Sequence, residues 1–165
     1  MVARLDAVGL LARLVTGGVW IAAGLAKLPD PAASVRAVRA YQLLPESIVP
    51  TVGHLLPVVE IVVGAALVVG LLTRGAAGLS LLLFLAFVVG IASVWARGLS
   101  IECGCFGGGG YRKGADSAYP WEIARDLGLG LLSLWLMIRP RTTLALDSLL
   151  FRRTEMSEDV EEVRS

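Results

Sequence analysis

Long apolar stretches separated by short polar segments dominate this chain. A helix of about 20 apolar residues crosses the hydrocarbon core of a bilayer. The predicted membrane spans are residues 7–28, 51–72, 76–96 and 121–138. The third carries no charge, whereas the fourth is uncharged only from Leu127 onward, so its first turns must enter the membrane edge or face a cavity. The pattern predicts an all-α fold, an integral membrane four-helix bundle.

Two of these spans contain residues that interrupt the apolar pattern. Arg13 lies within the first span, and the apolar region around it is too long for a cleaved signal peptide, so we expect the span to be retained. Pro57 lies within the second span, where it should kink the helix and free a backbone carbonyl near Gly53. The Thr-Arg-Gly sequence at residues 73–75 predicts a tight turn into the third span.

The segment between the first two spans, residues 29–50, has a short amphipathic pattern. Val35, Val38 and Tyr41 recur at helical spacing, while Arg36 and Arg39 lie on the other side. This pattern predicts a short amphipathic helix in the membrane interface. A plain extramembrane helix fits the pattern equally well.

The C-terminal region changes character after Pro140. Residues 141–151 form a short amphipathic piece that we expect to lie on the membrane surface as an interfacial segment. Residues 152–165 are polar and mostly charged, which predicts a disordered cytoplasmic tail. Residues 1–140 are then a single membrane domain.

Composition supports a membrane class and excludes others. The 165 residues allow one domain, and a hydrophobic content of 56% with mean hydropathy +0.73 is too apolar for an ordinary soluble domain of this size. The lipid bilayer is therefore the expected solvent. A net charge of +1 gives no reason to expect nucleic acid as a partner. One His and two Cys make a poor metal site, so we expect no metal.

Both cysteines of the chain, Cys103 and Cys105, follow the third span in the loop of residues 99–120. Residues two apart in an extended chain have Cα atoms ~7 Å apart, at the limit of disulfide reach, so closure needs a bend. Gly104 supplies that bend most easily. The ring would be small and reducible, which favours redox chemistry over a structural role. The alternative is a pair of reduced cysteines that only pack.

The surroundings of the cysteines bear on their reactivity. Arg97, Lys27 or Arg125 could stabilise a thiolate, whereas Glu102 would oppose it. Four consecutive glycines at residues 107–110 predict a mobile segment, because they have no side chains to pack. They lack the Lys-Ser/Thr of a phosphate loop, which excludes that kind of nucleotide site.

Ionisable residues inside the spans are the other candidates for function. A rise of ~1.5 Å per residue puts Glu60 ~13 Å below the outer face, near the bilayer middle, where a carboxylate must be paired or protonated. Glu60 could handle protons in an internal cavity, or form a structural ion pair with Arg13 or Arg125. Arg125 with Asp126 could also be a structural lock, although Arg125 could face the cysteines.

Four spans put both termini on the same side, and the basic residues indicate which side. The residues expected with the termini are Arg4, Arg74, Arg139, Arg141, Arg152 and Arg153, and those expected opposite are Arg36, Arg39, Arg112 and Lys113. The excess of positive charge favours cytoplasmic termini. The Cys-Gly-Cys loop would then be extracytoplasmic, where disulfides persist. The predicted location is the cell membrane.

Three short patterns carry a resemblance to a known family. Ala-Gly-Leu-Ala-Lys-Leu-Pro-Asp-Pro at 23–31 and Pro-Val-Val-Glu-Ile-Val-Val-Gly at 57–64 resemble DoxX-like membrane proteins. Cys-Gly-Cys-Phe-Gly at 103–107 resembles the MauE branch, and the likeness covers roughly residues 9–138. The resemblance implies a four-span helical protein associated with extracytoplasmic disulfide formation. MauE proteins are linked to maturation of methylamine dehydrogenase, whose small subunit needs many disulfides.

The resemblance also implies which residues matter. The family's cysteines correspond to Cys103 and Cys105, its carboxylate to Glu60 and its first-span lysine to Lys27, the last two without a defined role. The leading hypothesis is a thiol–disulfide oxidoreductase acting on a secreted thioredoxin-like or disulfide-containing partner, with a quinone between the helices as one candidate electron acceptor. The alternatives are a non-enzymatic scaffold for a redox partner and a small proton-coupled transporter that uses Glu60.

Overall fold

The computed structural model describes residues 2–139, and the side chains from Asp6 onward. The predicted interfacial segment and charged tail, residues 141–151 and 152–165, lie outside the described residues. The elements in chain order are α1 (Val2–Lys27), α2 (Pro31–Ala40), α3 (Val49–Val69), α4 (Thr73–Ala96), β1 (Ile101–Glu102), β2 (Gly110–Tyr111), the 3-10 helix η1 (Ala115–Ala118) and α5 (Tyr119–Ile138). The described part of the chain is therefore mostly helical.

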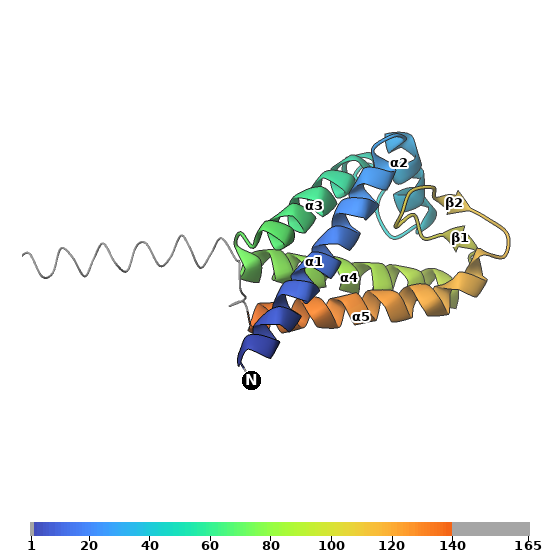
Figure 1. The fold of residues 1–165 in the computed structure, drawn as a ribbon. Coiled ribbons are helices and arrows are strands. Elements are labelled where there is room, and N and C mark those ends of the chain that lie inside the picture. The colour runs from blue at the N-terminus through green and yellow to red at the C-terminus, as the bar shows by residue number, and fades with distance from the viewer. Residues whose placement is uncertain (1, 140–165) are drawn as a thin grey trace, which may run out of the picture.

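The long helices pack in two pairs that cross each other (Figure 1). α1 packs mainly against α3, and α4 lies along α5. The short helix α2 and the hairpin β1–β2 gather at one end of the helices, while the N-terminus and the turn between α3 and α4 lie towards the other end. Segments far apart in sequence thus meet at the hairpin end, which places α2 beside the loop that carries the cysteines.

Three of the helices are long and apolar enough to cross a membrane: α1 from Asp6, α3 and α4. They correspond to the first three predicted spans, with ends that differ by a few residues. α5 is less apolar because Glu122, Arg125 and Asp126 lie in its first half. α5 nevertheless packs along α4. A fourth span, and with it a four-span bundle, stays a prediction.

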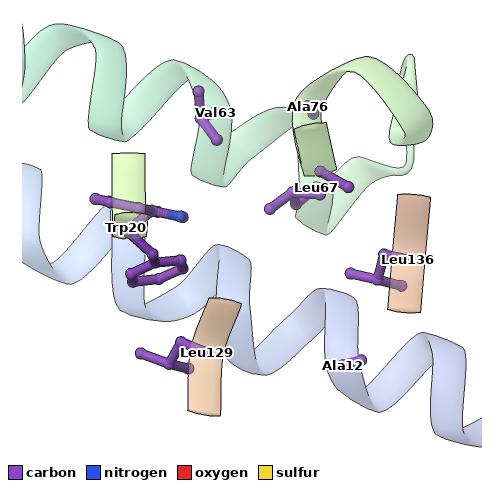
Figure 2. Packing of buried hydrophobic residues seen from close by; sticks show 9 residues of the cluster. Ala12, Trp20, Val63, Leu67, Ala76, Leu129 and Leu136 are labelled. Carbon is purple, nitrogen blue, oxygen red and sulfur yellow. The ribbon is translucent and has the colours of Figure 1, made fainter. Parts of the chain in front are cut away.

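The core between the helices combines apolar packing with a short polar chain. Figure 2 shows Trp20 of α1 among the buried side chains of the core, which include Val63 of α3 and Leu129 of α5. Its indole Nε1 donates a hydrogen bond to Ser80 Oγ of α4 at 2.7 Å, and Ser80 Oγ lies 2.9 Å from Ser133 Oγ of α5. These bonds give Trp20, Ser80 and Ser133 the hydrogen-bond partners that buried polar groups require. They join α1, α4 and α5 within the apolar core.

Small residues let α1 and α3 approach closely, as their frequency in the sequence indicates. A Cβ added to Gly17 would lie 2.7 Å from the carbonyl oxygen of Gly64, and one added to Gly64 would lie 2.6 Å from that of Gly17. Backbone thus faces backbone at this crossing. Any larger side chain at either position would push the two helices apart.

The predicted tight turn at residues 73–75 is wrong. α3 ends at Val69, and Gly70 caps it in the left-handed conformation with φ 75°, donating its N–H to the carbonyls of Ala66 and Leu67. Thr73 already begins α4. The reason is that a left-handed helix cap favours glycine. The glycine that ends α3 is Gly70, five residues before the glycine of the predicted turn.

The helix predicted between the first two spans is confirmed as α2, and its two faces differ as expected. Asp30 caps its N-terminus by accepting a hydrogen bond from Ala33 N at 3.0 Å. The buried side chains of α2 are Ala33, Ser34, Val35, Ala37 and Ala40. Arg36 and Arg39 lie on the exposed side, paired with Asp30 and Glu46. The packing of α2 against α3 and β2 fixes its position, while its place in a membrane interface stays a prediction.

The carbonyl that Pro57 frees in α3 has found a partner. Pro57 lacks an N–H, so the carbonyl of Gly53 loses its helical donor. Ser34 Oγ of α2 donates to that Gly53 oxygen at 2.7 Å, and Ser34 is buried. The prediction of a free carbonyl near Gly53 is thus confirmed, and the structure adds the hydroxyl that satisfies it.

Replacing Ser34 with alanine should therefore destabilise the packing of α2 on α3. A buried acceptor left without a donor costs about 1–3 kcal/mol. We expect a free energy of unfolding lower by roughly that amount, measured by denaturant unfolding in detergent micelles. Ser47→Ala, on the exposed stretch between α2 and α3, is the matched control and should have little effect. Equal stability of the two variants would contradict this role for Ser34.

Candidate functional site

The two cysteines are joined by a disulfide at the hairpin end of the molecule. The Cα atoms of Cys103 and Cys105 are 5.4 Å apart, within the usual range for disulfides. Gly104 between them has φ +70°, a conformation that favours glycine, and a Cβ there would lie 2.6 Å from the Cβ of Ala37 in α2. Cys103 is 8% and Cys105 9% exposed. The pair is therefore nearly covered, with α2 directly behind it.

The segment around the cysteines differs from the loose loop that four consecutive glycines predict. β1 pairs antiparallel with β2, with Ile101 opposite Tyr111 and Glu102 opposite Gly110. A Cβ added to Gly109 would lie 2.4 Å from the Cβ of Ala37. Gly109 is needed because its backbone packs against α2, and Gly107 because a Cβ there would lie 2.8 Å from the carbonyl oxygen of Ala26 in α1.

A buried ion pair supports the disulfide from below. Lys27, the last residue of α1, donates from Nζ to both carboxylate oxygens of Glu60, at 2.7 and 2.8 Å. The same Nζ donates to the carbonyl oxygen of Cys105 at 2.7 Å. Lys27 is 4% exposed and Glu60 is fully buried. All three ammonium hydrogens have partners, so Lys27 links α1, α3 and the Cys-Gly-Cys loop.

The sequence pointed to the wrong partners for Glu60. Arg13 instead donates to the carbonyl oxygens of Leu67 and Val68, at 2.9 and 3.0 Å, close to the C-terminal end of α3. A cation is favourable there because the last carbonyls of a helix carry partial negative charge. Lys27 reaches Glu60 because α1 and α3 approach closely one turn earlier, where a Cβ added to Gly24 would lie 2.7 Å from the carbonyl oxygen of Pro57, and because a lysine side chain is long.

Arg125 lies beside the cysteine loop, and it also forms the predicted pair with Asp126. Its Nη2 is 2.8 Å from Asp126 Oδ1. Its guanidinium lies 5.2 Å from the centre of the Phe106 ring, within cation–π range. The structure thus brings Lys27, Glu60, Gly104 and Arg125 around the two cysteines. Arg97 instead donates to the carbonyl of Tyr41.

Two tyrosines hold the cysteine segment, and the sequence analysis missed both roles. Tyr41 Oη donates to the carbonyl of Cys103 at 3.0 Å. Gly90 makes room for the Tyr41 ring, because a Cβ there would lie 3.1 Å from it. Burial raises the pKa of Tyr41, so its hydroxyl stays a donor at neutral pH. Tyr119 Oη accepts from Ile101 N at 2.8 Å. Only the helical spacing of Tyr41 hinted at an inward-facing ring.

An open cleft of about 450 Å³ lies over the disulfide. Both cysteines and Gly104 line it, together with the charged residues Glu102, Arg112, Lys113, Glu122 and Arg125. Its walls come from the hairpin, η1 and the start of α5. The disulfide, which is otherwise nearly covered, thus borders a cleft whose walls carry both positive and negative charges.

Glu102 beside the cysteines is held in its charged form. The guanidinium of Arg112 and the N–H of Gly109 both bond its carboxylate, and they lower the pKa of Glu102. These bonds make their full contribution to hairpin stability above pH 4.5, which is the ordinary pKa of glutamate. The contribution is lost as the pH falls through the lowered pKa of Glu102. At neutral pH the pair therefore keeps the cleft wall intact.

Replacing Arg112 with glutamine should raise the pKa of Glu102 back towards its ordinary range. A carboxyl carbon titration by NMR measures this directly, and the midpoint should move to higher pH. Lys113→Gln removes a neighbouring charge that has no bond to Glu102 among the described contacts. The Glu102 midpoint in this variant should therefore stay nearer that of the unaltered protein. Equal midpoints in the two variants would show that Arg112 is not the partner that matters.

Comparison with known proteins gives one family. The family model described as "Methylamine utilisation protein MauE" matches residues 5–139. That range includes the whole site and all described helices except the first three residues of α1. Searches of curated proteins and of solved structures gave no match.

Proposed function

This chain belongs to the MauE family, and from that premise we propose that it is a membrane thiol–disulfide exchange protein whose redox group is the Cys103–Cys105 disulfide. Family membership and the three apolar helices make it a multi-pass membrane protein. Family membership also supports a place in methylamine dehydrogenase maturation. The exchange chemistry and its partner are our addition. The resemblance to MauE is confirmed, whereas the likeness to DoxX-like proteins stays a prediction.

One observation carries the proposal: both cysteines of the disulfide line an open cleft of about 450 Å³ whose walls carry charged residues. A thiolate must approach a disulfide sulfur directly, so access decides which disulfides react. Arg112, Lys113 and Arg125 around the cleft would attract an incoming thiolate and stabilise the thiolate that leaves. A purely structural disulfide would gain nothing from such surroundings.

The exchange balances in two steps. A thiolate of a dithiol partner attacks one sulfur of the Cys103–Cys105 bond, which forms a mixed disulfide and releases the other cysteine as a thiolate. The second thiol of the partner then attacks the mixed disulfide. The partner leaves with a disulfide, and Cys103 and Cys105 are both reduced. A secreted thioredoxin-like protein or a protein that needs disulfides fits the partner's role.

We place the hairpin end outside the cytoplasm. The N-terminus and the turn between α3 and α4 lie at the opposite end, and the basic residues favour the cytoplasm for that end. The cleft would then open where disulfides persist and where secreted partners are found.

Thiol trapping in intact cells tests this proposal. A membrane-impermeant maleimide with a mass tag is added to cells before and after mild reduction. We expect both cysteines to be labelled only after reduction, because they form a reducible disulfide on the outer side of the membrane. Labelling without reduction would contradict an oxidising role. If labelling required opening the membrane, the cleft would not lie outside, and the proposal would fail.

A further inference from the structure

A second cavity shares part of its lining with the polar cleft, at Cys103 and Gly104. Its volume is about 280 Å³, and α2, α3, α4 and the segment after α2 enclose it. Val38, Leu56, Leu83 and Phe87 are among its apolar walls. Cys103 and Gly104 line this cavity as well as the cleft. The disulfide is thus part of the wall of two spaces with different character.

The cavity has an apolar mouth and a polar end. Leu43, Leu44 and Ala86 line it and are exposed side chains. The surface of α4 beyond Ala86 continues with exposed Leu82, Leu85 and Val89, on a helix apolar enough to span a membrane. Lys27 and Tyr41, which bond the carbonyl oxygens of Cys105 and Cys103, also line the cavity, as does Ser34. A molecule dissolved in the bilayer would therefore reach the disulfide from the side, without crossing the polar cleft.

The exchange reaction needs a destination for two electrons. Each turnover leaves Cys103 and Cys105 as thiols, and the sequence contains no other cysteine that could carry the electrons onwards. The acceptor must then reach this pair itself. A lipid-soluble carrier that takes two electrons and two protons matches both the chemistry and the apolar access.

We propose that this cavity binds the ring of a membrane quinone, which reoxidises the Cys103–Cys105 pair. The inference rests on the proposed thiol–disulfide exchange. One quinone and two cysteine thiols give one hydroquinone and the Cys103–Cys105 disulfide, so two electrons and two protons pass from the thiols to the quinone oxygens. Cys103 lines the cavity and Cys105 is not among its lining residues, so we infer that the Cys103 sulfur is the one that the quinone meets.

The shape of the cavity favours a ring over a simple acyl chain. Small-molecule sites are mostly apolar with a few polar groups that fix orientation, and this volume is close to the lower end of their usual range. A quinone ring would pack on apolar walls that include Phe87, with a carbonyl towards the polar end and its tail leaving between Leu43 and Ala86.

Filling the cavity tests this inference. Ala86→Trp places a large side chain at the mouth, and Ala92→Trp, an exposed position on α4 outside the cavity, is the matched control. The full-length protein in nanodiscs is reduced, freed of reductant and mixed anaerobically with decylubiquinone. We follow hydroquinone formation by absorbance and remaining thiols by maleimide mass tagging. Reduction of the disulfide by a soluble dithiol is measured separately for each variant.

We expect one hydroquinone for each disulfide formed, in the unaltered protein and in Ala92→Trp. Ala86→Trp should lower the rate with decylubiquinone by about tenfold or more, because a blocked cavity loses binding energy, while its disulfide still reacts with the dithiol. Equal rates for the two tryptophan variants, or no hydroquinone at all from a protein that reacts with dithiols, would overturn the quinone site alone. A disulfide that fails to react with dithiols would overturn the proposed function itself.

Discussion

Replacing Cys103 or Cys105 with serine is expected to abolish oxidation of a dithiol partner. The exchange needs both sulfurs, since one accepts the partner and the other must leave and later return to close the disulfide. We expect the rate to fall to the uncatalysed background in either variant. The measurement uses purified protein in nanodiscs with a reduced thioredoxin-like protein or a dithiol peptide, and follows disulfide formation in that substrate.

The single variants should also differ from the double variant in an informative way. The lone cysteine thiolate of a single variant can attack the disulfide of an oxidised partner, which forms a mixed disulfide and releases one partner thiolate. No second cysteine of the membrane protein is present to resolve it, so each single variant should trap a partner adduct in cells. The double variant offers no sulfur and should show no adduct. If all three variants supported full maturation of the partner, the protein would be a scaffold, and the exchange proposal would be wrong.

The long helices were predictable because their signal is a simple length of apolar sequence. Residues 51–72 and 76–96 predicted α3 and α4 to within a few residues. The predicted turn between these two helices was wrong because the sequence has two glycines there, either of which could end α3. Only the backbone conformation shows that Gly70 is the cap. Pro57 was more informative, because a missing N–H has a fixed consequence at the carbonyl four residues earlier.

The site was only partly predictable, because its contacts join distant segments. The cysteine pair is local, and the sequence identified it along with the glycine between its members. The bond from Lys27 to Glu60 links residues 33 apart, and the bond from Lys27 to Cys105 links residues 78 apart. Periodicity says that both charges lie in helices, but not how far one helix extends past the other. The polar roles of Tyr41 and Ser34 were missed for the same reason.

Replacing Lys27 with methionine is expected to destabilise the protein strongly. Glu60 would keep a buried carboxylate without its cation, and the carbonyl of Cys105 would lose its donor. Removing one partner of a buried ion pair costs about 3–5 kcal/mol. We expect a loss of that order in the free energy of unfolding in detergent micelles. Arg36→Met, which breaks the exposed pair with Asp30, is the control and should cost about 1 kcal/mol or less.

The double variant Lys27→Met with Glu60→Leu separates stability from function. Apolar residues of similar size often replace a buried ion pair without loss of stability, so the double variant should regain most of what Lys27→Met loses. It cannot restore the hydrogen bond from Lys27 to the carbonyl oxygen of Cys105, so the Cys-Gly-Cys loop loses that contact with α1. We therefore expect a stable protein whose exchange with dithiols is slower by about tenfold, comparable to the loss of one charged hydrogen bond. A double variant that is stable and fully active would show that the pair only locks α1 to α3. The support that Lys27 gives to the disulfide would then have no part in the chemistry.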